Sequence, residues 1–526
     1  MLLPTALSLT MLTALSFEDI PKPAVAEVDV THTEKRDHPW DLVEAPDGSF
    51  YVLSNQPTFW PRLMIRRYDA QGVEQWSHEH EIYRTPAGAG FDYITTTSAD
   101  ADGNLYFAYH TNLNGHGSFL VKMSPAHEVA WEVQLAKCSS IRQVRPTRKY
   151  GTHDVAVVCG TNGGGTQVTR LSGADGAQLS RNRSDSGNET ERYLQAAQTK
   201  TDETYVVGAW DGMKSDDLRR GTLAYKFAAD GSIAWRRLWE RTSSKPNDGA
   251  YYRSIAAYPD REGGVLGVFA VINTDTIEIH KIDPAGNRVG VHVLETGGHQ
   301  LSDSSLVTAE HNWINDEITV AWDDKQQKLP ATVIGVAVVD FEPRPQASTA
   351  KGAPSAAASS VKPAAWKGLT KRLTRIDSDD HDALVDVDVG DDGAIHLAAV
   401  DLDGGHDHIR ITRLSRFANG GYASLRFRRR EGHARPTHLL RSGSRLHVVG
   451  IEDAAVGDFI HYQADLLRLV LWTDGSQVIT AGPKASRPAI KPTAKPAAKP
   501  TAKPAGAPAA AAKTSRAPAP RAAASR

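Results

Sequence analysis

A short phrase that recurs along the chain constrains its fold more than any other feature. The phrase is an apolar residue, any residue, a basic residue and an apolar residue, usually followed by Asp or Ser. Its basic member returns about every 55 residues, at Arg67, Lys122, Arg170, Lys226, Lys281, Arg413 and Arg468. The longest gap contains a degenerate copy, GVAVVDF at 335–341, in which Val338 replaces the basic residue. A repeat of this period indicates a fold built from repeated structural units.

Each copy of the phrase lies among short apolar strands that are joined by tight turns. Runs of β-branched and aromatic residues follow the turns APDGS (45–49), DADGN (100–104) and GDDGA (390–394). After the phrase, a second turn leads to a Trp that we expect to pack between units, as in AADGSIAW (228–235). Gly supplies the positive φ angle that such hairpin turns require. No helical periodicity is sustained, so we predict an all-β fold.

The predicted architecture is a β-propeller of eight blades, each with four antiparallel strands, because radial closure protects the sheet edges. Seven blades is the alternative, if the first and last units share one blade. The sequence D-x-D-G-N-x-Y at 100–106 and the G-x-x-x-W turns at 72–76 and 231–235 resemble the pyrroloquinoline-quinone-like and NHL-like blades of bacterial secreted β-propeller repeat proteins. The resemblance extends over most of residues 38–482. It implies bladed sheets, and fold by itself implies no activity.

Three other segments flank or interrupt the predicted propeller, which we place at residues 27–482. Residues 1–26 are a predicted signal peptide, because the first 16 residues carry no charge and AVA at 24–26 has the form of a cleavage site. A buried first strand or a wrongly assigned start are the alternatives. An Ala, Pro and Ser-rich stretch at 343–366 predicts a disordered insertion, and the Lys, Pro and Ala-rich residues 483–526 predict a disordered tail.

Charge and cysteine content narrow the possible partners and the compartment. From residue 484 onward there are ten Lys and Arg and no acidic residue, so a net charge of −2 leaves about −12 on the rest of the chain. Such a tail can contact polyanions, or serve as a spacer or fold back on the acidic body. Cys138 and Cys159 either form one disulfide or are core thiols. No apolar run is long enough to span a membrane, and we expect a monomer that is periplasmic or secreted.

The candidate ligand site is a ring of polar side chains at one mouth of the propeller channel. An Asn or Asp follows the second strand of each unit, and loops at this position lie on one face of a propeller. The alternative is that these side chains satisfy backbone groups of their own turns. The predicted ring consists of Asn55, Asn112, Asn162, Asp211, Asn273, Asp323, Asp401 and Asp453.

One loop is the candidate metal site. The sequence DLDGGHDH at 401–408 places Asp401, Asp403 and His406 close together, and carboxylate oxygens are ligands that suit Ca²⁺. Ordinary turn chemistry is the alternative, since Gly404 and Gly405 are typical turn residues. Adding the imidazole of His406 to the carboxylates would instead suit a transition metal.

The sequence contains no nucleophile elbow, zinc-protease helix or phosphate-binding loop. We therefore predict an exported binding or scaffold protein that engages a protein or glycan through its polar loops, with the tail contacting anionic surfaces. The alternative is a propeller enzyme, a quinone-type dehydrogenase or a glycan lyase or hydrolase. Such an enzyme could use paired carboxylates such as Asp323 and Asp401 across the channel. A cytoplasmic propeller associated with nucleic acid is the third hypothesis.

Overall fold

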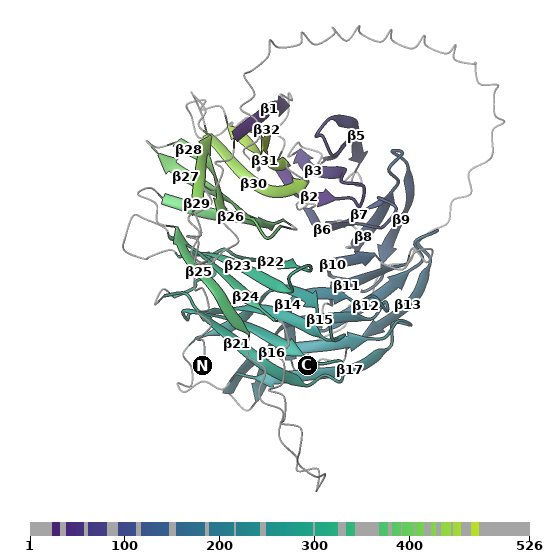
Figure 1. Ribbon diagram of the computed structural model, residues 1–526. Helices are drawn as coiled ribbons and strands as arrows, with labels where there is room; N and C mark the ends of the chain where they lie inside the picture. The colour runs from purple at the N-terminus through teal and green to yellow at the C-terminus, as the bar shows by residue number, and fades with distance from the viewer. Residues whose placement is uncertain are drawn as a thin grey trace, which may run out of the picture. The chain divides into compact units, whose positions relative to one another are not determined.

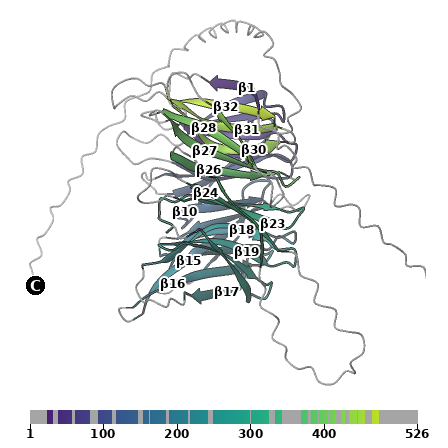
Figure 2. The ribbon, with the colours of Figure 1, turned by 60° about the vertical axis from the view of Figure 1, so that its left-hand side comes forward.

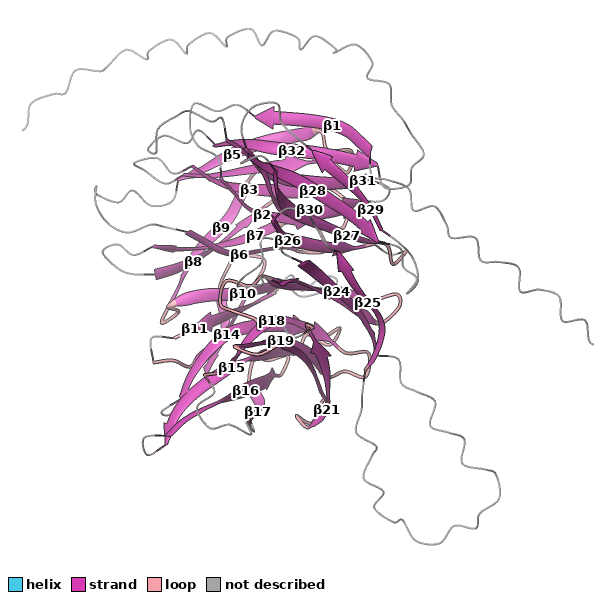
Figure 3. Ribbon diagram, turned by 90° about the vertical axis from the view of Figure 1, so that its left-hand side faces the viewer, coloured by secondary structure: helices cyan, strands magenta, loops and turns pink. Residues whose placement is uncertain are grey.

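The structure is a computed structural model. It describes residues 24–31, 38–56, 62–81, 93–111, 117–146, 154–161, 163–184, 189–214, 217–241, 249–297, 300–324, 333–341, 368–376, 381–390, 392–403, 406–414, 422–427, 433–442, 445–453 and 464–472. The chain divides into two units, residues 1–478 and 479–526, and all described residues belong to the first. They contain strands and turns but no helix (Figure 3). Among them, no segment could cross a membrane as an apolar helix.

The first four blades follow one another along the chain (Figure 1). Blade 1 contains β2 (His38–Glu44), β3 (Phe50–Gln56), β4 (Arg62–Tyr68) and β5 (Glu74–Glu81). Blade 2 contains β6 (Tyr93–Ala99), β7 (Leu105–Thr111), β8 (Gly117–Met123) and β9 (Val129–Leu135). Blade 3 contains β10 (Ser140–Pro146), β11 (Val155–Gly160), β12 (Thr166–Leu171) and β13 (Gln178–Arg183). Blade 4 contains β14 (Glu189–Gln198), β15 (Thr204–Lys214), β16 (Asp217–Phe227) and β17 (Ile233–Glu240).

The remaining blades repeat this order, and the last one borrows a strand from the start of the chain. Blade 5 contains β18 (Tyr251–Pro259), β19 (Val265–Ile272), β20 (Thr276–Ile282) and β21 (Arg288–Glu295). Blade 6 contains β22 (Val307–Asn312), β23 (Glu317–Asp324), β24 (Val333–Asp340) and β25 (Leu369–Ile376). Blade 7 contains β26 (His381–Val389), β27 (Ile395–Asp403), β28 (His406–Leu414) and β29 (Tyr422–Phe427). Blade 8 contains β30 (His433–Ser442), β31 (Arg445–Asp453), β32 (Ala464–Trp472) and β1 (Ala24–Thr31).

The described strands thus form eight four-stranded sheets, and every paired neighbour is antiparallel. The first strand of each sheet contacts the first strand of the next, and β2 contacts β30, so the ring of blades is closed. The N-terminal strand β1 pairs with β32 as the outer strand of blade 8 (Figure 2). The predicted fold class, an all-β propeller with blades of four antiparallel strands, is confirmed.

The hydrophobic core lies between neighbouring blades. All eight residues of β19 are buried, and they alternate between two clusters. Leu266 and Val268 pack with blade 6, whereas Val265 and Phe269 pack with blade 4. Because side chains of a strand point alternately to opposite faces, a strand buried on both faces joins its two neighbouring blades. The same arrangement holds around the ring, and it explains why the second strands of the repeat are almost wholly apolar.

The antiparallel order gives the propeller two distinct ends. The turns that join the first to the second strand and the third to the fourth strand of a blade lie at one end, which we call the turn face. The loops from the second to the third strand and the connections between blades lie at the other end, the loop face. The Asp-Gly turns found in the sequence belong to the turn face, and the predicted polar ring belongs to the loop face.

The repeated basic residue lies on the third strand of its blade and is held at the turn face. Lys281 is 3.3 Å from Asp260 and 2.8 Å from Glu262, two acids of the first turn of blade 5. Lys226 is 2.8 Å from Glu203 in the corresponding turn of blade 4, and it lies over the ring of Tyr205. Arg67 and Lys122 repeat this arrangement with Asp47 and Tyr51, and with Asp100 and Tyr106. The repeated base therefore stabilises a turn of its own blade.

The Trp residues of the second turn join one blade to the next, as the sequence predicted. Trp235 of β17 donates a hydrogen bond from Nε1 to the carbonyl of Pro284, 3.0 Å away in the next blade. Trp131 and Trp76 donate in the same way to Gly173 and Pro125. The turn that receives Trp235 contains Gly286 at a φ of 86°, and a Cβ there would lie 2.8 Å from the indole ring. Glycine is thus required both by the backbone and by the close approach of the Trp.

Several predicted segments lie at or beyond the edge of the described residues. Strand β1 begins at Ala24, three residues before the expected start of the propeller, while residues 1–23 lie outside the described part. The predicted insertion at 343–366 is also outside it, between the third and fourth strands of blade 6, and so is the tail at 483–526. GVAVVDF falls on β24, the third strand of blade 6, as expected for the degenerate copy. Cys138 and Cys159 form a disulfide, which decides between the two alternatives.

Candidate ligand sites at the two ends of the channel

Of the predicted polar ring, the structure describes four side chains, and only one of them lines a cavity. Asp211 lies in a loop-face pocket, described below. Asn273 follows β19 at a φ of 66° and donates from Nδ2 to the carbonyl of Gly249, 3.0 Å away. It therefore links the turn after β19 to the connection between blades 4 and 5.

The other two described ring members are buried inside their own blades. Asp323 of β23 is 1% exposed, and its Oδ1 accepts a hydrogen bond from the backbone N–H of Leu306. Asp401 of β27 is fully buried, and one of its oxygens lies 2.6 Å from Nε of Arg426. Both occupy second strands, whereas the first strands line the channel. The side chains of Asn55, Asn112, Asn162 and Asp453 lie outside those that the structure describes.

The predicted metal loop is a hairpin between β27 and β28. Asp403 and His406 are partners in the register of this hairpin, and their side chains are outside the described set. Asp401, the third predicted ligand, is engaged by Arg426. The described side chains contain no group of three potential ligands that could hold a metal ion. The Ca²⁺ site at Asp401, Asp403 and His406 stays a prediction.

The loop-face pocket has a volume of about 240 Å³ and lies between blades 4 and 5. The register of β14 with β15 skips two residues after Arg192, and the first of them, Tyr193, has a φ of 53°. This bulge leaves Tyr193 37% exposed at the pocket. A left-handed backbone is uncommon for an aromatic residue, and such strain is concentrated at binding sites. The full lining is Arg192, Tyr193, Ala209, Asp211, Arg220, Tyr251, Tyr252 and Asp303.

Two arginines flank Asp211 in this pocket. Nε of Arg192 is 3.4 Å from one carboxylate oxygen, and Nε of Arg220 is 3.6 Å from the other. Arg220 also donates from Nη1 to the carbonyl of Gly249 and lies over the ring of Tyr251, with its Cζ 5.7 Å from the ring centroid. These contacts fix Arg220 in place, whereas the Arg192 side chain is 55% exposed and reaches toward solvent.

Tyr251 and Arg253 connect this pocket to blade 6. The hydroxyl of Tyr251 donates to the Asp303 carboxylate, and Arg253 donates to the carbonyls of Asp303 and Ser305. Burial lowers the pKa of Arg253. Leu306, which follows these acceptors, is 37% exposed. The surface around the pocket thus combines arginine, tyrosine and exposed apolar groups on three successive blades.

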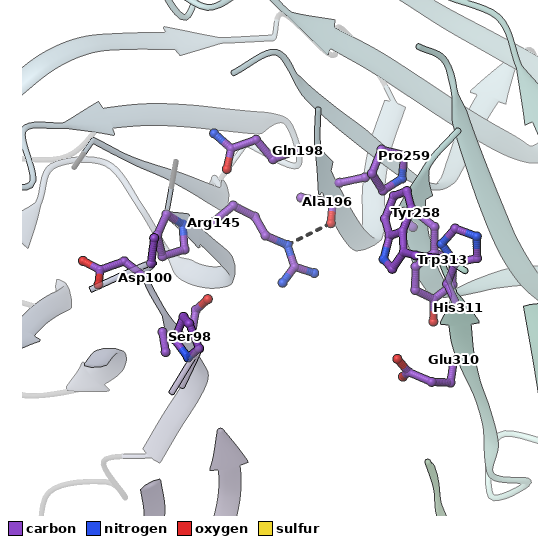
Figure 4. Close-up of a pocket in the computed structure, with 16 residues that line it drawn as sticks. Ser98, Asp100, Arg145, Ala196, Gln198, Tyr258, Pro259, Glu310, His311 and Trp313 are labelled. Carbon is purple, nitrogen blue, oxygen red and sulfur yellow. Dashed lines mark hydrogen bonds between the residues drawn. The ribbon is translucent and has the colours of Figure 1, made fainter. Parts of the chain in front are cut away.

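A second cavity, of about 420 Å³, lies at the turn-face end of the channel (Figure 4). The C-terminal ends of the first strands of blades 2 to 6 line it together with Pro46 in the first turn of blade 1, so its residues come from six different blades. Arg145 of β10 and Glu310 of β22 stand on opposite sides and point toward one another across it. The other lining residues are Pro46, Ser98, Ala99, Asp100, Ala101, Pro146, Ala196, Ala197, Gln198, Ala257, Tyr258, Pro259, His311 and Trp313.

This channel pocket was not predicted from the sequence. The sequence analysis searched the loop face, and Arg145 and Glu310 belong to no repeated phrase. A comparison of the first strands with one another could have singled out these two residues. Most blades have apolar or small residues at the positions where β10 and β22 carry a charge. Without the closed ring, nothing in the sequence shows that these two strands face each other.

Comparison with known proteins shows a likeness in fold only. No protein-family model matches the chain, and no curated protein sequence matches it. A structure of the Dos1 propeller shares 10% identity over 85% of this chain and 95% of that chain, with a TM-score of 0.46. The quinohemoprotein alcohol dehydrogenase from Comamonas testosteroni shares 10% identity over 89% and 79%, with a TM-score of 0.45. A europium-containing methanol dehydrogenase shares 9% identity over 87% and 94%, with a TM-score of 0.47. These likenesses assign no activity, ligand or partner to this chain.

Proposed function

We propose that the protein is a binding or scaffold module that engages a partner, a protein or a glycan, through the loop face of blades 4 to 6. The observation that carries this proposal is the pocket in which Arg192, Arg220 and Tyr251 surround Asp211 beside the strained Tyr193. Arginine and tyrosine are the residues most enriched at the energetic centres of protein interfaces.

The partial exposure of this surface supports the proposal. Arg220 is held by backbone carbonyls of the next blade, so little conformational entropy is lost when a partner contacts it. Arg192 is more exposed and offers a guanidinium that can form a bidentate contact with a carboxylate. Of the two partner classes, this composition favours a protein that presents an acidic side chain.

The experiment compares partners captured by the full-length chain and by a charge-reversal variant. We expect Arg192→Glu to lower the recovery of a specific partner at least tenfold in cross-linking with mass spectrometry. Arg237→Glu is the matched control, because Arg237 is an exposed arginine on the outer strand β17. Equal recovery by wild type and both variants would remove the loop face as the binding surface. A glycan array run with the same three proteins identifies a carbohydrate partner.

We also propose an oxidising compartment, the periplasm or the exterior, as the place of action. The Cys138–Cys159 disulfide supports this, because disulfides persist outside the reducing cytosol. The signal peptide at 1–26 and a tail at 483–526 that contacts anionic surfaces are parts of the same proposal. Thiol labelling after rapid denaturation of cells tests the compartment, because Cys138 and Cys159 are buried in the folded protein and a cytosolic protein would then show two reduced, labelled cysteines. Replacing the tail lysines by Gln in the full chain tests the tail, which should lose salt-sensitive binding to anionic vesicles.

A further inference from the structure

The channel pocket at the turn face places a base and an acid on opposite walls. Nε of Arg145 donates to the carbonyl of Ala196 on β14, 3.0 Å away, and this bond directs the guanidinium into the pocket (Figure 4). Glu310 approaches from β22 of blade 6, three blades further along the ring than Arg145 of blade 3. A cavity of about 420 Å³ is within the usual range for small-molecule sites.

The acidic wall extends beyond Glu310 to the neighbouring first strand β26. The negative charges of Asp388 and Asp386 on β26 disfavour the ionisation of Glu310 and raise its pKa. Both carboxylate oxygens of Asp386 already accept backbone N–H groups, from Val387 and Leu439. Asp386 therefore has a structural role. Asp100 also lines the pocket, but its carboxylate accepts hydrogen bonds from Asn104 and Tyr106 and lies 3.9 Å from Lys122. We therefore assign Glu310 as the acid that meets a ligand.

Aromatic side chains form the wall between these charges. The hydroxyl of Tyr258 donates to the carbonyl of Ala309 and is 2.5 Å from it, which fixes the ring at the pocket. The ring of His311 packs between those of Tyr258 and Trp313, with centroid distances of 5.2 and 4.3 Å. Trp313 is 38% exposed, so part of this apolar wall is open to a ligand.

We propose that this pocket binds a small zwitterion, a free amino acid with an apolar side chain, whose carboxylate contacts Arg145 and whose ammonium group contacts Glu310. The guanidinium of arginine matches the two oxygens of a carboxylate. The apolar side chain lies against Tyr258 and Trp313. The two charges of the ligand are thus met by opposite walls, which an amine or a carboxylic acid alone does not achieve.

The protonation of Glu310 gives this site a pH dependence. Burial, with smaller contributions from Asp388 and Asp386, raises the pKa of Glu310 to about 8, while Arg145 acts to lower it. Besides Arg145, the other titratable groups at the pocket are Asp100, Tyr258 and His311, and burial keeps the pKa of Tyr258 well above its usual value. An ammonium group favours the ionised form of Glu310, so the proton and the ligand compete for this carboxyl. The affinity should therefore rise from pH 6 to pH 8.5.

The test is calorimetric titration of the full-length chain with L-phenylalanine, 2-phenylethylamine and 3-phenylpropionate. We expect the amino acid to bind at least tenfold more tightly than either singly charged analogue. Glu310→Gln should weaken amino-acid binding at least tenfold and abolish the pH dependence, and Arg145→Met should weaken it by a similar factor. Glu128→Gln is the matched control, because Glu128 is an exposed acid on a turn of blade 2 and should change nothing.

Three results would overturn the proposal. The first is no measurable binding of the amino acid at millimolar concentration, and the second is equal affinity for the amine or the acid. The third is unchanged binding by Arg145→Met, or by Trp313→Ala if the Arg145 variant does not fold. Because Arg192 is at the other end of the channel, Arg192→Glu should leave amino-acid binding intact. Failure of the loop-face proposal is thereby distinguished from failure of this one.

Discussion

The turn face and the loop face of this propeller are built on different principles. At the turn face, blade after blade uses the same parts, namely a basic residue on the third strand, an acid in the first turn and in several blades a Trp that reaches the next blade. At the loop face, the described residues show no such shared set of parts. The described polar residues at the loop face have different roles, since Asp211 lines a pocket and Asp323 is buried in its blade.

The comparison separates two sets of residues in this chain, those that recur from blade to blade and those that line the two pockets. The repeated Lys281 and Trp235 hold turns and join blades, which every blade of a closed ring requires. The residues that line the two pockets, such as Arg145, Glu310 and Tyr193, interrupt the repeat. A charge or a strained backbone in a position where other blades have small residues is the feature on which we base the two proposed binding sites.

The largest effect should come from removing a Trp that joins two blades. Trp131 is 8% exposed within the core between blades 2 and 3 and donates to the Gly173 carbonyl. Trp131→Ala should lower the free energy of unfolding by about 3–5 kcal/mol, measured by urea denaturation. Trp313→Ala, the same change in the channel pocket, should cost less than about 1 kcal/mol. If the two variants lose similar free energies of unfolding, the distinction between residues that join blades and residues that line the pocket is wrong.

A buried base of the turn face should be the next most sensitive position. Lys281 is 5% exposed beside Asp260, which is 3% exposed, so Lys281→Met leaves a buried carboxylate without its cation. The expected loss is about 3 kcal/mol. Lys371 of β25 also contacts two acids, Glu317 and Asp340, but it is 41% exposed. Lys371→Met should cost below about 1 kcal/mol, and an equal cost would show that the repeated position is not special.

Loss of the disulfide should destabilise blade 3 to a comparable or smaller extent. Cys138 and Cys159 are 21 residues apart, and a crosslink of this span contributes about 2–4 kcal/mol. The double variant Cys138→Ser, Cys159→Ser should therefore unfold at lower urea, and reductant should lower wild-type stability to the same value. If reductant leaves the wild-type midpoint unchanged, the two cysteines are thiols in solution.

The smallest effect should be the pH dependence that arises at the channel pocket. Burial raises the pKa of Glu310 to about 8 and that of Asp386 to about 7, so the folded chain holds protons that the unfolded chain releases. Their contribution to stability is full below the usual carboxyl pKa and is lost as the pH rises through 7 to 8. Between pH 5 and pH 8.5 the loss should be on the order of 1–3 kcal/mol. Glu310→Gln should flatten this slope in thermal unfolding, and an unchanged slope would exclude Glu310 as its source.

The sequence by itself determined the blades of this protein. Strand alternation, Asp-Gly turns and the spacing of Arg67, Lys122 and their counterparts predicted four-stranded antiparallel sheets, because these signals act over a few neighbouring residues. The Trp that joins one blade to the next was also predictable, since its position in the repeat is constant. The partner of β1 was not, because pairing of Ala24 with Trp472 depends on closure of the whole ring.

Only the tertiary structure decided where ligand sites can form. The ring of Asn and Asp residues was inferred from position alone, and position does not distinguish Asp211 in a pocket from Asp401 buried against Arg426. Arg145 and Glu310 are 165 positions apart in sequence, yet ring closure places them on opposite walls of one cavity. A blade is specified by local hydrogen bonding and side-chain alternation. A site shared by six blades depends on long-range packing, which a sequence without its fold does not display.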